Sequence, residues 1–103
     1  GPANPTVNLA DGIQVIMPTS VVYTFPTDVD MSTVTQTRFT AVGSGGCSVN
    51  SLTSVVVSGN TATVNLSACA LGTIKINVNL SNIKDQTGNS GTGTFTKTYM
   101  VVL

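Results

Sequence analysis

Apolar and polar side chains alternate along most of this chain, and no segment shows the three-to-four-residue spacing of an amphipathic helix. The clearest example is the segment 73–80, TIKINVNL, whose aliphatic residues share one face: Ile74, Ile76, Val78 and Leu80. The segment 20–25, SVVYTF, turns a second set of side chains inward: Val21, Tyr23 and Phe25. Both patterns predict half-buried β-strands with one side in water.

The segment 54–66, SVVVSGNTATVNL, predicts a β-hairpin with a two-residue turn at Gly59-Asn60. Both turn residues tolerate a positive φ, as a tight hairpin turn requires. The expected register pairs residues as follows: Ser58 with Thr61, Val57 with Ala62, and Val55 with Val64. The apolar pairs then share one face, so the turn and the alternation agree.

Shorter strands are expected at 14–17, 38–42 and 93–103, and Asp30 is expected to cap a helical turn. About seven short strands separated by polar turns predict an all-β, immunoglobulin-like β-sandwich of antiparallel strands. Lys97 shares the inward parity of the last strand, so it must snorkel, lie at an edge or follow a bulge.

The composition limits the number of domains and the classes of partner. With 103 residues the chain forms about one domain, and only 8% of its residues are charged, against about 25% in ordinary domains. Four Asp balance four Lys and Arg, so the surface cannot neutralise several phosphates. The charge therefore disfavours nucleic acid and anionic membranes as partners, and no apolar run is long enough to insert into a membrane. We interpret Gly1-Pro2 as a protease scar, take 1–4 as scar or linker, and predict one domain over 5–103, excised from a longer protein.

Cys47 and Cys69 are the two cysteines of the chain, which has no His. Two thiols alone cannot complete a four-ligand zinc site, and their separation does not fit a redox CxxC motif. In an extracellular setting the pair predicts one disulfide, which would join two loops at one pole and stabilise the fold by about 3 kcal/mol. The alternative is a pair of buried free thiols. The glycines of 43–46 are expected to form a flexible loop leading into Cys47.

Three motifs occur in a set order. A Pro and a Gly-containing turn open the chain (5–15, PTVNLADGIQV), and a strand ending in Phe runs into an acidic, Met-containing turn (21–34, VVYTFPTDVDMSTV). A strand, an Asp-x-x-Gly-Asn turn and a last strand close it (74–80, 82–89 and 94–102). This order resembles bacterial Ig-like domains of the S-layer and surface-protein type. The resemblance implies a tandem extracellular module, but such domains usually lack cysteines, so the disulfide would be an addition of this domain.

The resemblance implies that Asp85, Gly88 and Asn89 form a structural turn. Asp85 would accept backbone N–H groups, Gly88 would take a positive φ, and Asn89 would bond to its own backbone. The alternative is a calcium ion shared with a neighbouring domain, held by Asp85 together with Asp28 and Asp30. Calcium takes six to eight oxygens, which four Asp supply poorly, so we predict no metal and no cofactor.

Catalysis is not expected, because the chain has no His or Glu and its thiols are predicted to be oxidised. At Lys97, a Lys–Asn isopeptide bond is the alternative to a snorkelled lysine. Around Asn77 and Asn79, we expect an ordinary solvated sheet face, and a sugar-binding face is the alternative. The lack of Trp favours the solvated face.

These observations leave two candidate functions. The first is a non-catalytic spacer or stalk in a secreted or cell-surface bacterial protein, whose partners are the neighbouring domains of its own chain. The second is an adhesive or fibre-tip module that binds a receptor or glycan through loops such as 43–50, with Val56 and Met100 available to an oligomer interface. A spacer should be monomeric and should bind no glycan.

Overall fold

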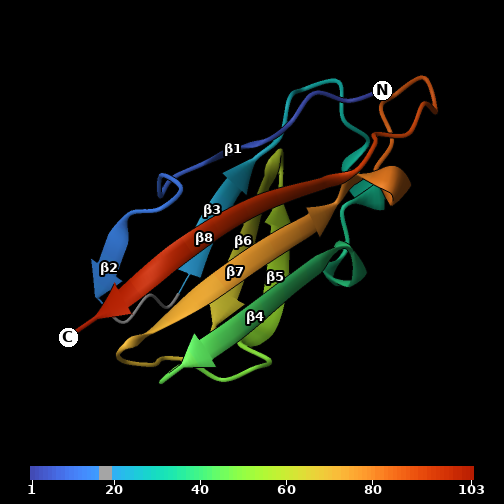
Figure 1. Ribbon diagram of the computed structural model, residues 1–103. Helices are drawn as coiled ribbons and strands as arrows, with labels where there is room; N and C mark the ends of the chain where they lie inside the picture. Colours follow the sequence, from blue (N-terminus) through green and yellow to red (C-terminus); the bar gives the residue numbers. More distant parts are fainter. Residues whose placement is uncertain (17–19) are drawn as a thin grey trace.

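Two four-stranded β-sheets pack face to face in the computed structural model, which describes residues 1–16 and 20–103 (Figure 1). The first sheet consists, in spatial order, of β1 (Thr6–Val7), β3 (Ser20–Thr24), β6 (Thr61–Leu66) and β5 (Leu52–Ser58). The second consists of β2 (Gln14–Ile16), β8 (Thr94–Val102), β7 (Gly72–Asn79) and β4 (Phe39–Gly45). Three single 3₁₀ turns lie in the connections between these strands: η1 (Met31–Thr33) and η2 (Gln36–Arg38) between β3 and β4, and η3 (Leu80–Asn82) between β7 and β8. The predicted all-β sandwich is confirmed.

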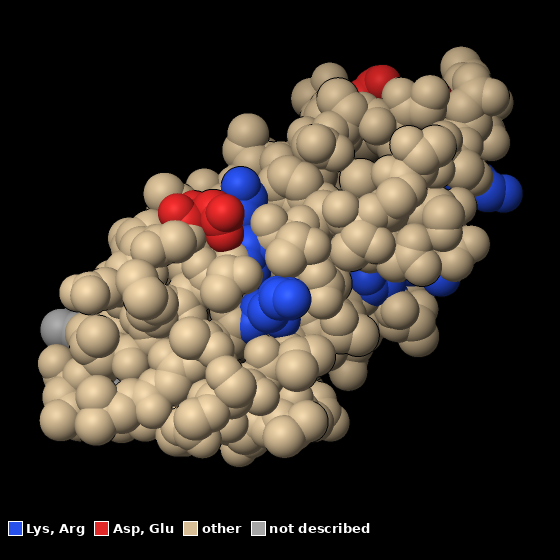
Figure 2. All heavy atoms as spheres, in the orientation of Figure 1, with Lys and Arg blue, Asp and Glu red and all other residues tan. Residues whose placement is uncertain are grey.

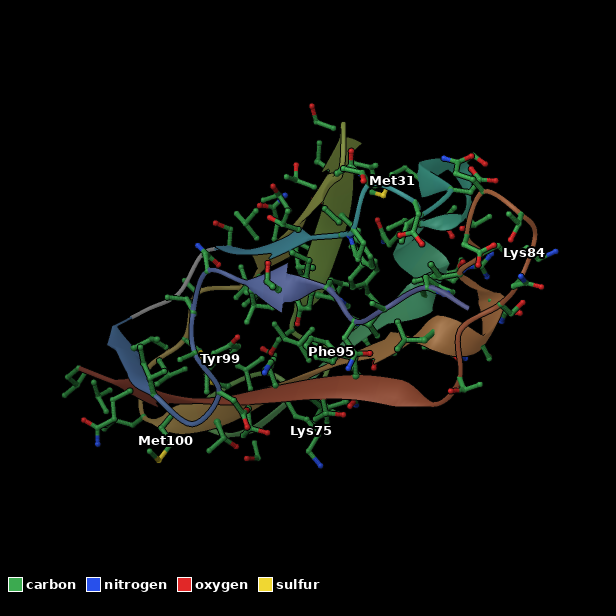
Figure 3. The ribbon with its side chains drawn as sticks, turned by 90° about the horizontal axis from the view of Figure 1, so that it is seen from above. Met31, Lys75, Lys84, Phe95, Tyr99 and Met100 are labelled. Carbon is green, nitrogen blue, oxygen red and sulfur yellow. A yellow bond between two sulfur atoms is a disulfide. The ribbon has the colours of Figure 1, made fainter. Side chains whose placement is uncertain are left out.

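The core is the layer of inward-facing side chains between the sheets. These residues are at most 2% exposed: Val21, Tyr23, Ala62 and Val64 from the first sheet, and Ile74, Ile76, Val78, Tyr99 and Val101 from the second. Figure 3 shows the alternation on β8 and β7, where Phe95 and Tyr99 point toward the opposite sheet while Lys75 and Met100 point away from it. The period of two in the sequence therefore decides which atoms are removed from water.

The β5–β6 hairpin has the predicted register, with Ser58 opposite Thr61 and Val55 opposite Val64. Gly59 has a φ of +55°, as its turn position requires. Val55 and Val57 are only partly covered, because β5 lies at the edge of its sheet. An irregularity between Leu52 and Ser54 ends the regular ladder.

Strand number and direction differ from the prediction. Within the described residues there are eight strands rather than about seven, and β2 runs parallel to β8, with Gln14 opposite Met100 and Ile16 opposite Val102. The chain pairs first with β3 through β1, then crosses to the other sheet through a turn at Gly12, where φ is +78°. This crossover determines which strand β2 pairs with, and the alternation of apolar and polar residues does not predict a crossover. Met17, expected to be the last residue of this strand, lies outside the described residues.

The predicted loop at 43–46 is also wrong. Gly43 and Gly45 belong to β4 and lie opposite Ile74 and Gly72 of β7. A Cβ on Gly43 would lie only 2.1 Å from the carbonyl oxygen of Ser48, so glycine here permits a close backbone approach rather than flexibility. The strand expected at 38–42 accordingly begins at Phe39 and extends to Gly45.

The molecule is elongated, with extents of 44 × 22 × 21 Å, and its two termini lie at opposite ends (Figure 1). We call the end that carries Gly1, η1 and the segment 84–90 the amino pole. We call the other end the disulfide pole: it carries the connections 46–51 and 67–71 and the final residue, Leu103. Asp30 caps η1 at the amino pole by accepting from the N–H of Ser32, as predicted.

Candidate functional site

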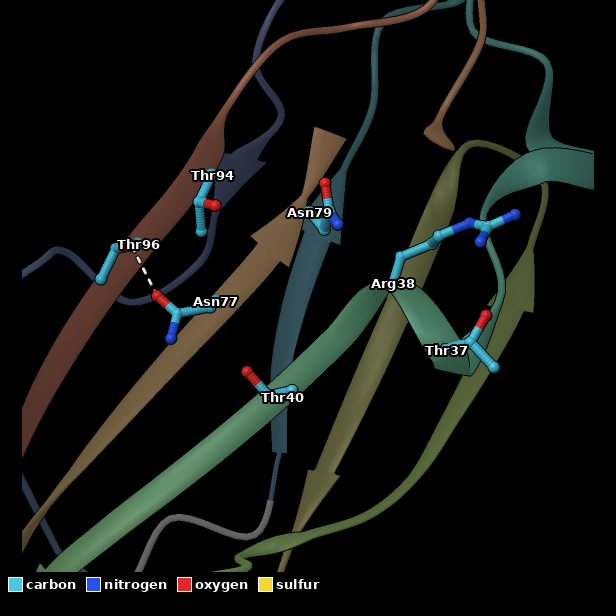
Figure 4. A pocket seen from close by; sticks show the side chains of 7 residues that line it. All are labelled: Thr37, Arg38, Thr40, Asn77, Asn79, Thr94 and Thr96. Atoms are coloured by element: carbon cyan, nitrogen blue, oxygen red, sulfur yellow. Dashed lines mark hydrogen bonds between the residues drawn. The ribbon is translucent and has the colours of Figure 1, made fainter. Parts of the chain in front are cut away.

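A shallow polar groove lies on the outer face of the second sheet, with a volume of about 540 Å³ (Figure 4). Every side chain that lines it carries a hydroxyl, amide or guanidinium group: Thr37, Arg38, Thr40, Asn77, Asn79, Thr94 and Thr96. The strand register makes the groove, because Thr40, Asn77 and Thr96 stand opposite one another on β4, β7 and β8. Of these residues, Asn77 and Asn79 are the two that the sequence pattern indicated. Thr40, Thr94 and Thr96 share their outward parity on neighbouring strands, and Thr37 and Arg38 come from η2. This signal is readable only once the strand order is known.

The groove is partly organised by its own hydrogen bonds. Thr96 Oγ1 donates to Asn77 Oδ1 at 2.6 Å, which fixes the amide plane and leaves the Asn77 NH₂ group as a donor. Arg38 Nε donates to the carbonyl of Thr33 at 3.1 Å, which anchors the guanidinium at the rim. The lining contains no aromatic ring and no acid. The groove can thus hydrogen-bond a hydroxyl-rich ligand, but it offers no surface for a sugar ring to stack on.

A smaller hollow of about 370 Å³ continues along the same face, between Val42 and Thr98. Lys75 is the charged residue among those that line it, and Figure 2 shows a few separate basic groups and a smaller acidic area on this face. The outer face of the second sheet is therefore a weakly cationic, hydroxyl-rich surface.

The segment 84–90 forms a compact turn at the amino pole. Asp85 Oδ1 accepts from the N–H groups of Thr87 (3.0 Å) and Asn89 (2.9 Å) and from the Thr87 hydroxyl (2.7 Å). Gly88 has a φ of +87°, and the Asn89 side chain donates to Thr87 Oγ1 rather than to its own backbone. The turn is also joined to the segment before η1, because Gln86 N–H donates to the carbonyl of Asp28 at 2.8 Å.

These bonds set the ionisation of Asp85. The hydroxyl of Thr87 and the N–H of Asn89 hold the pKa of the Asp85 carboxyl below its ordinary value of 3.8. Because the folded pKa lies below the unfolded one, the contribution of this turn is present above pH 3.8 and is lost as pH falls through the folded pKa. We expect NMR titration of the Asp85 carboxyl carbon to give a pKa below 3.8, the ordinary value of an aspartate.

The matched variant is Asp85→Asn, which keeps the shape of the side chain and removes its charge. At neutral pH we expect the amide protons of Thr87 and Asn89 to exchange with solvent faster in this variant, because their acceptor is weaker. Unchanged exchange at both amides would show that the carboxylate does not hold the turn.

The three acids of the amino pole do not converge. Asp30 Oδ1 is occupied by the N–H and hydroxyl of Ser32, and Asp85 Oδ1 is occupied by its own turn. In residues 1–16 and 20–103 there is no group of three or more His, Cys, Asp or Glu side chains placed to hold a metal ion. No helix in the part of the chain described here is long and apolar enough to cross a membrane.

Cys47 and Cys69 form a disulfide with a Cα–Cα distance of 5.0 Å, so the free-thiol alternative is wrong. The bond joins the β4–β5 connection to the β6–β7 connection, and both connections pass from one sheet to the other. Gly72 packs against the bridge, since a Cβ there would lie 2.9 Å from Cys47 Sγ. The disulfide thus closes one end of the sandwich.

Lys97 lies at an inward-facing position of β8, and its side chain snorkels. Its Nζ lies 4.8 Å from the centroid of the Phe95 ring, two residues earlier on β8. The side chain is half-buried, and the ring face stabilises the ammonium group. This contact supports the snorkelled interpretation over an isopeptide bond.

Two fully buried tyrosines differ in their hydroxyl groups. Tyr99 donates to the carbonyl of Leu9 at 2.8 Å, whereas the Tyr23 hydroxyl has no hydrogen-bond partner among the described residues. Burial, with a smaller contribution from Asp11, raises the pKa of Tyr99 to about 12. Burial raises the pKa of Tyr23 further still. Tyr23 is nonetheless well packed, edge-on to Phe39 and Phe95.

This difference gives a matched pair of variants. Tyr99→Phe should lower the free energy of unfolding by about 1 kcal/mol, because the Leu9 carbonyl loses its donor. Tyr23→Phe should leave stability unchanged or raise it by up to about 1 kcal/mol, because a buried, unpaired hydroxyl is removed. Urea unfolding of both variants tests the difference. If Tyr23→Phe is the more damaging variant, the Tyr23 hydroxyl has a partner in solution.

Comparison with known proteins gives structural neighbours only: no family model matches the chain, and no curated protein does. Three solved structures of one bacterial surface-layer protein are similar over 97% of this chain. "Structure of surface layer protein SbsC, domains 1-6" matches with a TM-score of 0.61 and 27% identity. "Crystal structure of the N-terminal part of the bacterial S-layer protein SbsC" matches with a TM-score of 0.60 and 26% identity. The chain spans 14% and 24% of these two surface-layer structures, so it is similar to a small part of a much longer bacterial surface-layer protein.

CopC from Methylosinus trichosporium OB3b also matches, at 9% identity and with a TM-score of 0.56. The match covers 96% of this chain and 92% of that one, and it shows a shared fold alone.

Proposed function

We propose that this chain is a non-catalytic structural module of an extracellular or cell-surface bacterial protein, of the immunoglobulin-like type, and that it acts as a spacer between neighbouring domains. One observation carries the proposal: similarity over 97% of the chain, at 26–27% identity, to single segments of a surface-layer protein. The disulfide supports an oxidising compartment, since such bonds are rare in the cytosol.

The shape supports the mechanism. The termini lie at opposite ends of a body 44 Å long, so inserting the domain in a chain holds the preceding and the succeeding domain apart. The two faces are rich in Thr, Ser and Asn and poor in charge, which keeps them hydrated without attracting charged partners.

Deleting the domain from the full-length protein tests this function. We expect the protein to shorten by about the domain's length while its other domains keep their folds, and small-angle X-ray scattering would report the change in maximum dimension. The isolated protein should run as a monomer in size-exclusion chromatography. If deletion leaves the maximum dimension unchanged, the spacer function is wrong.

The polar groove favours one second candidate, a binding site for a hydroxyl-rich ligand such as a glycan. Its seven donor and acceptor side chains support this function, and the absence of a stacking ring within its lining counts against it. A glycan array separates the two. Binding that is lost in Asn77→Ala, with Thr63→Ala on the opposite sheet as the control, would replace the spacer function by an adhesive one.

A further inference from the structure

The disulfide pole holds apolar side chains out in water. Leu71 is 61% exposed, Val49 is 77% exposed and Leu103 is 79% exposed. All three lie at the end of the sandwich where the β4–β5 and β6–β7 connections meet the end of β8 (Figure 1). Scattered surface hydrophobes are normal, so exposure alone decides nothing.

Leu71 carries a second, independent peculiarity in its backbone. Its φ is +58°, which makes it the one residue other than glycine with a positive φ in the described part of the chain. A left-handed conformation is unfavourable for a side chain branched like leucine, and glycine would adopt it freely. The position therefore bears both backbone strain and an exposed apolar side chain, and neither stabilises this domain by itself.

The surroundings keep Leu71 in that conformation. Gly46 N–H donates to the Leu71 carbonyl at 2.8 Å, and the Cys47–Cys69 bridge joins the two connections beside it. Gly72 comes directly after Leu71 and is packed against Cys47. The apolar end is thus a preformed surface, which loses little conformational entropy when something covers it.

We propose that the disulfide pole is an interdomain contact surface, on which Leu71 and Val49 pack against an uncharged, apolar end of another folded domain of the same chain. This inference rests on the proposed function and adds to it the end, the residues and the chemistry of the contact. The surface-layer structures to which the chain is similar are several times its length, which fits a neighbouring domain as the occupant.

A second copy of this domain is a poorer occupant for two reasons. The patch exposes roughly a few hundred Å², well below the about 800 Å² per partner of a stable interface between free proteins. A tethered neighbour needs far less, because the linker supplies a high effective concentration. In addition, head-to-tail stacking of copies would place Leu71 against the amino pole, which carries Asp28, Asp30 and Lys84.

The test uses the protein joined to the domain that the proposal places after Leu103. In ¹⁵N relaxation, the two domains should share one rotational correlation time in the wild type. The pair Leu71→Ser and Val49→Ser should abolish this shared tumbling, and the two correlation times should separate. Val56→Ser, which alters an exposed valine on the outer face of the first sheet, is the matched control and should leave it intact.

The variant Leu71→Gly distinguishes a role of Leu71 in an interface from a role in the stability of this domain. It suits the positive φ and removes the apolar side chain, so it should uncouple the domains while the melting temperature of this domain stays the same or rises. Loss of the fold in Leu71→Gly, shared tumbling in every variant, or independent tumbling in the wild type would each overturn the proposal. So would a concentration-dependent dimer broken by Leu71→Ser, or the absence of a folded domain after Leu103. The absence of a following domain would contradict the spacer function as well, whereas none of the other results bears on the length measured in the deletion experiment.

Discussion

Replacing Cys47 and Cys69 together by alanine is expected to lower the free energy of unfolding by about 3 kcal/mol. The bridge spans 22 positions of the sequence, and in the chain-entropy model a loop of that size restricts the unfolded ensemble by about this amount. Stability also falls because the two connections that close one end of the sandwich are no longer joined. Urea unfolding of the double variant against the oxidised wild type measures the loss.

Reduction of the wild type provides the control for packing. Wild-type protein in reductant should lose about as much stability as the double variant, because both lack the covalent bond. Any difference between the two measures the packing of the sulfur atoms, which only the variant lacks. Ser48→Ala, beside Cys47 and exposed, should change little. A double variant as stable as the oxidised wild type would show that hydrogen bonds such as Gly46 N–H to the Leu71 carbonyl hold this end without the bridge.

Ile76→Ala is expected to cost about 3–4 kcal/mol, the largest effect of a single substitution that we predict. Ile76 is fully buried at the centre of β7, opposite Ala41 of β4 and Lys97 of β8. Neither neighbour can fill the lost volume, because Ala41 is small and Lys97 lies over the Phe95 ring. The substitution therefore leaves a cavity in addition to the lost burial of apolar surface.

Lys75→Ala is the matched control, one position earlier on the same strand with its side chain in solvent. It should change the free energy of unfolding by less than about 0.5 kcal/mol. Thermal and urea unfolding of both variants should therefore separate widely. Equal effects at the two positions would contradict the assignment of inward and outward faces on β7.

The alternation of the sequence was enough to predict the layers of the fold. In β7 and β3, each residue predicted to face inward is buried, because side chains on a strand alternate strictly between its two faces. The β5–β6 register also followed from local information, since a two-residue turn and an apolar face must agree. The disulfide could be predicted because the chain has two cysteines and no other group that pairs with them.

Predictions failed where a residue's role depends on a distant neighbour. Gly43 is expected from the sequence to lie in a flexible loop, but its missing Cβ admits the backbone of Ser48. The strand at Gln14–Ile16 was expected, but its parallel pairing with β8 was not, since any exposed edge can accept so short a segment.

What the sequence determined by itself was the two-layer fold, the inward faces of its strands and the covalent bridge, because these depend on periodicity and on pairs of unique residues. Only the tertiary structure decided which strands are neighbours, and through that order it assembled the Thr and Asn groove from β4, β7 and β8. It also placed Leu71, strained and exposed, beside the disulfide at one pole. The physical reason is range: alternation is a property of each strand alone, whereas a groove or a pole is a property of segments far apart in sequence that meet only when the chain has folded.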